Sequence, residues 1–125
     1  MPLVFSVTRE DMLRSKTVEP AWYKCKVKAI TQESASTDGS VLAVVDLVIL
    51  EGAFKDVPVR RYFSEKAPGF TVPFFAACGA TVKEEGGTYD FDRCKDKTIL
   101  VYIKNEMYQN RLTNKAEDFK PLAAA

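Results

Sequence analysis

Histidine is absent from this chain of 125 residues. Its absence removes the side chain that most often serves as a general base or as a metal ligand. A strong charge of either sign is also missing, because 18 basic and 17 acidic residues leave a net charge of +1. A neutral total does not exclude nucleic acid, since cations can still gather on one face. We therefore expect a protein that is not an enzyme, that has no cofactor or metal, and whose binding depends on where its charges lie.

Cysteine is scarce, with three residues too far apart to form a Cys-x-x-Cys pair. An odd number of separated cysteines argues against a disulfide framework and favours a reducing cytoplasm. Cys25 and Cys78 fall on apolar faces, so we expect them in the core. Cys94 stands beside Arg93 and Lys95, which would lower the pKa of its thiol, but the chain has no histidine to act as its base.

Long apolar runs are missing too, and none approaches the length of a membrane-spanning helix. Residues 1–5 lack a basic region followed by an apolar stretch, so we expect no signal peptide. Hydrophobic residues nevertheless make up 46% of the chain and charged residues 28%, which is enough for one packed core with a charged surface. We expect residues 1–125 to form a single domain, with residues 118–125 as a flexible tail.

Two short helices are predicted from capping residues. The first should cover residues 9–16, with Thr8 as its N-cap and Asp11 as the reciprocal partner of that cap. The second should cover residues 72–78, with Thr71 as its cap and Phe74, Phe75 and Cys78 facing the core.

The rest of the chain is predicted to be mainly β. Alternating or β-branched runs predict strands at residues 21–32, 41–50, 57–63, 89–91 and 97–104, followed by a turn and a final strand over 105–115. Pro58 favours an edge position for its strand, because proline donates no hydrogen bond to a ladder. This order predicts an antiparallel barrel of five to six strands, similar to an OB fold, with a short helix between strands 3 and 4.

The first strand carries the clearest binding signal. Trp22, Lys24, Lys26 and Lys28 share one face of it. Alternate residues of a strand lie about 6.6 Å apart, close to the repeat of a stretched nucleotide backbone. Three ammonium groups could therefore follow successive phosphates while the indole stacks on a base. The alternative is an ordinary solvent-facing strand whose lysines keep the protein soluble.

Two further clusters combine cations with aromatic rings. One lies on the third strand, where an arginine able to bind phosphate should share the open face with a tyrosine. The other lies on the last strands. The alternative for the first of these clusters is a solvated strand edge, and for the second it is a buried ring. Binding of nucleic acid requires all three clusters to lie on one face of the barrel. These candidate residues are Arg60, Tyr62, Tyr102, Lys104, Tyr108 and Arg111.

Carboxylates offer a weaker alternative. Asp90 and Asp92 would share a strand face and could bind Mg²⁺ in a nuclease, but a solvated turn explains them much better. Gly86 and Gly87 lack the lysine of a phosphate-binding loop, so we interpret them as a turn.

In the order of its segments the chain resembles phage-encoded single-stranded DNA-binding proteins with an OB fold. The resemblance runs over nearly the whole chain, through PAWYKCKVKAI, VLAVVDLVIL, VRRYFSEKAPGF, FFAACGA and DKTILVYIKNEMYQNRLTN. Ser64, Lys66 and Ala67, and the phenylalanine-rich helix ending at Gly79, are most like that family.

The resemblance implies sequence-tolerant binding of single-stranded DNA during phage replication, recombination or repair. It implies a location in the cytoplasm of the infected bacterial host, with no contact to membranes. Phage replication or recombination proteins would be further partners, and the chain could form a homo-oligomer. The residues that the resemblance would assign to DNA are Trp22, Lys24, Lys26, Lys28, Arg60, Tyr62, Tyr102 and Lys104. One departure is that residues 119–125 hold no acidic run, so recruitment of partners through an acidic tail is not expected.

A second class of function fits the same sequence. Small barrels also serve as structural or assembly proteins of virus particles, because a fold does not determine a function. Near-neutral charge suits that role, whereas the lysine–tryptophan strand suits it less.

Overall fold

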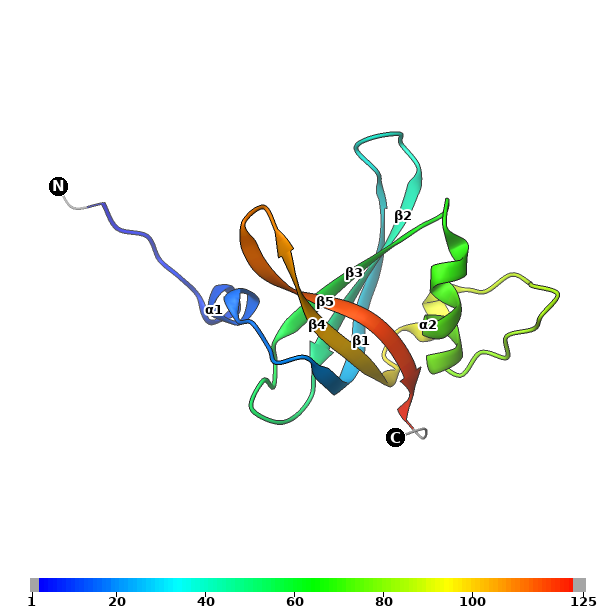
Figure 1. Ribbon diagram of the computed structural model, residues 1–125. Coiled ribbons are helices and arrows are strands. Elements are labelled where there is room, and N and C mark those ends of the chain that lie inside the picture. The colour runs from blue at the N-terminus through cyan, green and yellow to red at the C-terminus, as the bar shows by residue number, and fades with distance from the viewer. Residues whose placement is uncertain (1–2, 123–125) are drawn as a thin grey trace.

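Five strands and two short helices form the part of the chain that the computed structural model describes, residues 3–122 (Figure 1). The mainly β class and both predicted helices are confirmed. The helices are α1, Arg9–Ser15, and α2, Val72–Ala77, with 3₁₀ turns at η1, Pro68–Thr71, and η2, Phe91–Cys94. The strands are β1, Ala21–Ser34; β2, Val41–Ile49; β3, Pro58–Ser64; β4, Thr98–Tyr108; and β5, Arg111–Pro121.

All five strands belong to one sheet in the order β3-β2-β1-β4-β5, with antiparallel neighbours throughout. The predicted edge position of β3 is confirmed, and α2 lies between β3 and β4 in the chain as expected. Because directions alternate, the two edge strands, β3 and β5, run the same way. The sheet curves until these edges approach each other, and the rings of Phe63 and Phe119 lie 5.9 Å apart across them (Figure 1).

A closed barrel was predicted, but within residues 3–122 no backbone ladder joins β3 to β5. A side chain spans the seam instead: Arg61 Nη1 on β3 donates a hydrogen bond of 2.7 Å to the carbonyl oxygen of Ala116 on β5. The half-buried guanidinium also lies 4.8 Å from the centre of the Phe63 ring. The sheet is therefore open in its backbone pairing, and the Arg61 side chain links its two edges.

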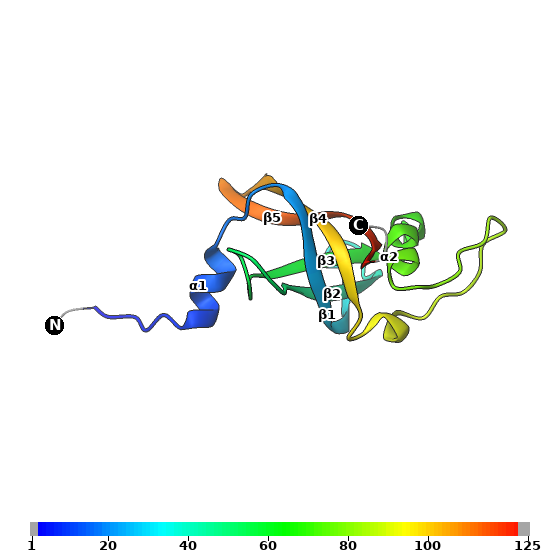
Figure 2. The same cartoon turned by 90° about the horizontal axis from the view of Figure 1, so that it is seen from below.

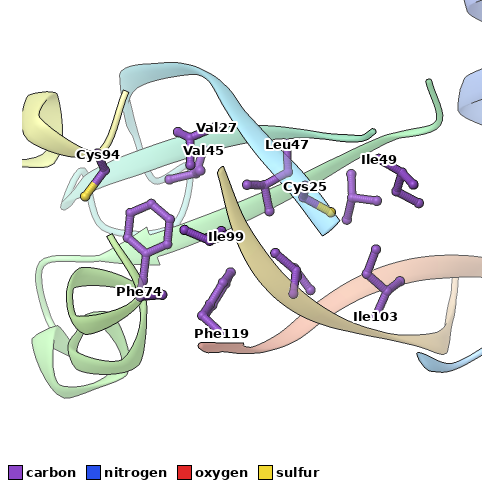
Figure 3. Close-up of a cluster of buried hydrophobic side chains, with 14 of the residues drawn as sticks. Cys25, Val27, Val45, Leu47, Ile49, Phe74, Cys94, Ile99, Ile103 and Phe119 are labelled. Carbon is purple, nitrogen blue, oxygen red and sulfur yellow. The ribbon is translucent and has the colours of Figure 1, made fainter. Parts of the chain in front are cut away.

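The core lies inside the curve of the sheet (Figure 3). Alternate residues of the central strands point into it, as the period of two predicts. At one end α2 covers the core, and Phe74 packs against Phe63 at 5.4 Å and against Phe119 at 5.3 Å. The buried strand residues include Cys25, Val27, Val45, Leu47, Ile49, Ile99, Val101 and Ile103.

The other end of the core is closed by the segment between α1 and β1. Val18 is buried there, and Asn114 Oδ1 accepts a hydrogen bond from its backbone N–H at 2.9 Å. Asn105 Nδ2 donates to the Val18 carbonyl oxygen at 2.9 Å, and Asn114 Nδ2 donates to that of Lys16 at 2.7 Å. Two asparagines of the β4–β5 hairpin thus provide hydrogen-bond partners for the backbone groups of a short extended segment that does not pair with any strand. Figure 2 shows α1 and α2 at opposite ends of the sheet.

The predicted cap of α1 is confirmed, because Thr8 and Asp11 exchange side-chain-to-backbone hydrogen bonds of 3.1 and 3.0 Å. Thr71 occupies the N-cap position of α2 as predicted, but its side chain does not cap the helix. Thr71 Oγ1 donates instead to the carbonyl oxygen of Pro68, because η1 precedes the helix and turns the chain into it.

One strand prediction is wrong, because residues 89–91 form no strand and lead into η2. The predicted turn and final strand over residues 105–115 are present with different bounds, since β4 continues to Tyr108 and β5 begins at Arg111 after a tight turn. In addition, β5 extends to Pro121 with Phe119 buried, so the first residues of the expected tail belong to the sheet, while residues 123–125 lie outside the described part. Among the described residues, no helix has the length and apolar character needed to cross a membrane.

Candidate nucleic-acid interface

The most exposed aromatic pair on the outer face of the sheet is Trp22 with Tyr102. These residues are direct partners in the β1–β4 ladder, and their rings meet edge to face at 5.5 Å. Trp22 is 39% exposed, which is unusual for the one tryptophan of the chain when apolar core positions lie on the same strand. The tyrosine holds the indole from one side and leaves part of it open to a ligand.

Lysines surround this pair. Lys24 lies two residues along β1, and its ladder partner Leu100 pairs in turn with Lys120 of β5. The Lys120 Nζ atom lies 4.3 Å from the centre of the Trp22 ring, in a cation–π contact. Lys26 continues the row, with its Nζ atom 3.9 Å from Asp96 Oδ1, a long and solvent-exposed ion pair. We call Trp22, Lys24, Lys26, Tyr102 and Lys120 the Trp22 patch.

The charges of the Trp22 patch are largely free. Within residues 3–122 neither Lys24 nor Lys120 forms an ion pair. The patch therefore presents three ammonium groups around a ring pair. Two carboxylates lie near it, Asp96 at 3.9 Å from Lys26 and Asp118 as the ladder partner of Tyr102, and neither forms an ion pair with Lys24 or Lys120. A surface of this kind attracts a polyanion whose units also carry flat rings.

Lys28 follows on β1 but at an irregular position. The ladder between β1 and β2 shifts register between Val27 and Ala29, so Lys28 is the additional residue of a bulge. Its side chain is exposed and lies in the row that began at Trp22, at the end farthest from it.

Arg60 and Tyr62 lie on the same outer face but two strands away, on β3. Their partners in β2 are Asp46 and Val44, and Asp46 pairs in turn with Ala29 of β1. Arg60 Nε donates a hydrogen bond of 2.7 Å to Asp46 Oδ1, and this bond raises the pKa of Arg60 above its usual value. We call Asp46, Arg60 and Tyr62 the Arg60 patch. Its positive charge is already matched by a carboxylate.

Lys104 is likewise neutralised. It lies beyond Tyr102 on β4, with its Nζ atom 3.4 Å from Glu117 Oε1. Lys115 joins the same network, at 3.5 Å from Glu117 and 3.6 Å from Glu106. Two lysines and two glutamates thus balance one another on the β4–β5 hairpin, which leaves no net charge there.

Tyr108 and Arg111 face each other at the tip of this hairpin. The turn between them has positive φ at Gln109 and Asn110, 49° and 64°, which matches the twist of a two-residue hairpin turn. Tyr108 is 65% exposed and stands apart from the Trp22 patch, about six residues farther along β4. The structure therefore brings Trp22, Lys24, Lys26 and Tyr102 together, and it leaves the other candidates at separate places on the outer face.

Lys120 was missed in the sequence. Residues 118–125 were assigned to a tail, although Phe119 and Lys120 continue an inward–outward alternation from buried Ala116 with one bulge. A strict period of two counted from Ala116 would place Lys120 on the inner face, so only a bulge before buried Phe119 turns Lys120 outward, and no feature of the sequence indicates that bulge.

The acidic pair does not form the strand face that was predicted. Asp90 precedes η2, and its Oδ1 atom accepts a hydrogen bond from the backbone N–H of Asp92 at 2.9 Å. Asp90 therefore serves as a helix cap. Within residues 3–122 no cluster of three metal-ligating side chains is present. As predicted for core positions, Cys25 is buried and Cys78 is partly buried, and Cys94 is buried as well.

No protein-family model matches this chain, and no curated protein is significantly similar to it.

Proposed function

We propose that this chain binds single-stranded DNA without strong sequence preference, through base stacking on Trp22 and contacts from lysines to phosphates. The observation that carries the proposal is the Trp22 patch, in which a half-exposed indole is surrounded by lysines that lack close carboxylate partners. Such a surface suits a ligand with alternating flat rings and negative charges. A double helix hides its bases, so a single strand fits the exposed ring better.

The strand would follow β1. Phosphates would pass from Lys24 to Lys26 at the roughly 6.6 Å spacing of alternate strand residues, and toward Lys28. The Lys120 ammonium now lies over the indole, in the place that a stacked base would take. On binding, the base displaces Lys120, whose flexible side chain reaches a phosphate instead. Four lysines in all would contact the backbone.

The order of elements supports a relationship to the OB fold. A helix between β3 and β4, one five-stranded antiparallel sheet, and edge strands that run the same way are the features that such a barrel combines. In OB folds the face of strands 2 and 3 and the loops between strands 1 and 2 and between strands 4 and 5 bind oligonucleotides. The Trp22 patch lies beside that face, on β1, β4 and β5, and the β4–β5 turn is one of those loops. Tyr108 and Arg111 at the hairpin tip would then extend the site. We include in the proposal a role in phage replication, recombination or repair in the host cytoplasm. The order of segments along the chain is the only support for that role.

A non-enzymatic assembly protein of a virus particle is the second candidate. It is favoured by apolar side chains left bare near the N-terminus, among them Leu3 and Phe5 at 85% and 80% exposure. It predicts a defined oligomer and no salt-sensitive binding of DNA.

The two candidates are separated by a gel-shift titration with single- and double-stranded oligonucleotides at two salt concentrations. Single-strand binding with about four phosphate contacts should give a salt slope of about −3, from roughly −0.7 for each phosphate. Absence of a shift at low salt would reject the proposal. Equal binding of the duplex would reject the role given to Trp22.

A further inference from the structure

An apolar segment projects from the body of the protein at its N-terminal end. Residues 3–7, which we call the N-terminal arm, run in an extended path away from α1 in both views (Figures 1 and 2). Four of the five side chains are apolar. Leu3, Val4, Phe5 and Val7 are 85%, 77%, 80% and 63% exposed. Within residues 3–122 no hydrogen bond involves the backbone of the arm, so both its side chains and its backbone lack partners in the same chain.

A cleft that could receive such a segment lies next to α1. It has a volume of about 640 Å³, within the range of pockets that hold ligands. Its floor is apolar, made by Leu13 of α1 with Ala29, Leu47, Val48 and Val59 of the sheet. Seven charged side chains stand around this floor, and six of them are paired: Arg9 with Asp56 at 3.5 Å, Arg14 with Glu10 at 2.8 Å, and Arg60 with Asp46 at 2.7 Å. Within residues 3–122 the seventh, Lys28, forms no ion pair. The cleft, which we call the α1 cleft, therefore offers an apolar floor inside a rim whose charges are mostly matched.

The arm does not enter the α1 cleft of its own chain. The capping box at Thr8 fixes the direction in which the chain enters α1, with Thr8 extended at φ −83° and ψ 167°. Arg9, the next residue, already lines the cleft, so the arm would have to reverse direction within one residue to fold back. A second copy faces no such restriction.

We propose that two copies of this chain form a symmetric dimer in which each inserts its N-terminal arm into the α1 cleft of the other. A two-fold axis near α1 would allow this, because the arm and the cleft lie on either side of that helix and the same contact is then made twice. Burying four apolar side chains removes roughly 400 Å² of surface on each arm. Two arms and two receiving clefts would together bury roughly 1,600 Å², the size of a standard stable interface. The dimer requires no DNA, and it is argued from the arm and the cleft alone, although the cleft shares Lys28 and Arg60 with the candidate DNA-binding residues.

Sedimentation velocity of the full chain, without DNA, tests the oligomeric state. The chain should sediment at twice its mass of 14.0 kDa at micromolar concentration. Phe5→Asp should shift it to the mass of one chain without changing its circular dichroism, since an exposed arm residue contributes no packing to the fold. Phe70→Asp is the matched control, because Phe70 is also exposed, at 67%, but lies in η1 far from α1, and it should leave the dimer intact. A monomeric wild-type chain, or a dimer that survives Phe5→Asp, would overturn the proposal.

The receiving site is tested separately. A spin label on Phe5→Cys, in a Cys78→Ser background, is mixed with isotope-labelled wild-type chain. In the mixed dimer the label should broaden the amide signals of Ala29, Val48 and Val59 in the other copy. Broadening confined to other residues would reject the α1 cleft even if the arm holds the dimer together.

Discussion

The Trp22 patch and the Arg60 patch lie on the same outer face of one sheet, and both combine cations with an exposed ring. They differ in what surrounds the cations. In the Arg60 patch a carboxylate lies 2.7 Å from the guanidinium, whereas in the Trp22 patch the nearest carboxylate is 3.9 Å from Lys26. A phosphate gains little from an arginine that already holds Asp46, because the existing bond must first be broken. The comparison shows that two similar sets of cations and rings can differ in how far their charges are already matched, and under the proposed function this difference should decide which patch binds DNA.

Reversing two charges of the Trp22 patch should have the largest effect. In the variant Lys24→Glu/Lys26→Glu two phosphate contacts are lost, which weakens binding of oligo(dT) by about 60-fold at 50 mM salt and reduces the salt slope by about 1.4. Fluorescence anisotropy across a salt series measures both. Lys83→Glu is the control, because Lys83 is exposed on a distant loop and should bind DNA as the wild type does. An equal loss in Lys83→Glu would mean that total charge, and not the patch, governs binding.

Removing the indole should have the next largest effect. Trp22→Ala eliminates one stacked base, at about 2 kcal/mol or about 30-fold in affinity, with the salt slope unchanged because no phosphate contact is lost. The same anisotropy series measures it. Tyr62→Ala is the matched change in the Arg60 patch, where Tyr62 is 48% exposed, and should cost less than about threefold. The comparison fails if the tyrosine change costs as much as the tryptophan change.

Releasing Arg60 from its carboxylate should have a smaller effect of opposite sign. Asp46→Asn leaves the arginine free to contact a phosphate, so binding should tighten by about threefold and the salt slope should steepen by up to about 0.7. Weaker binding of this variant would show that Asp46 itself contacts DNA.

Neutralising Arg60 should have the smallest effect. Arg60→Gln removes a cation that already holds Asp46, so affinity for oligo(dT) should change by less than about twofold. A tenfold loss of affinity would mean that Arg60 contacts the DNA, and the proposed difference between the two patches would then be wrong.

The sequence predicted the elements of the fold better than their contacts. The alternation around Cys25 and Val27 was enough to place the lysines of β1 on the outer face. It could not show that Asp46 lies opposite Arg60, because register between strands depends on the whole sheet. For the same reason it could not show that Lys120 reaches Trp22 across β4.

The way in which the edges of β3 and β5 meet could not be predicted from the sequence either. Strand order predicted a barrel, but the two edges are joined by a side-chain hydrogen bond from Arg61 and not by a backbone ladder, and strand order does not distinguish these cases. A turn was predicted within residues 105–115, but its position at Gln109 and Asn110 was not, because neither residue is glycine although both adopt positive φ. These errors concern single residues whose conformation is set by distant neighbours.

The intrinsic fluorescence of Trp22 tests the central claim most directly, since the chain has one tryptophan and its signal reports on that one place. Oligo(dT) should quench it, and the quenching curve should give the same dissociation constant as the gel shift, because a base stacks on the ring that carries the signal. Binding in the gel shift with unchanged tryptophan emission would contradict the account, since the DNA would then lie elsewhere on the protein.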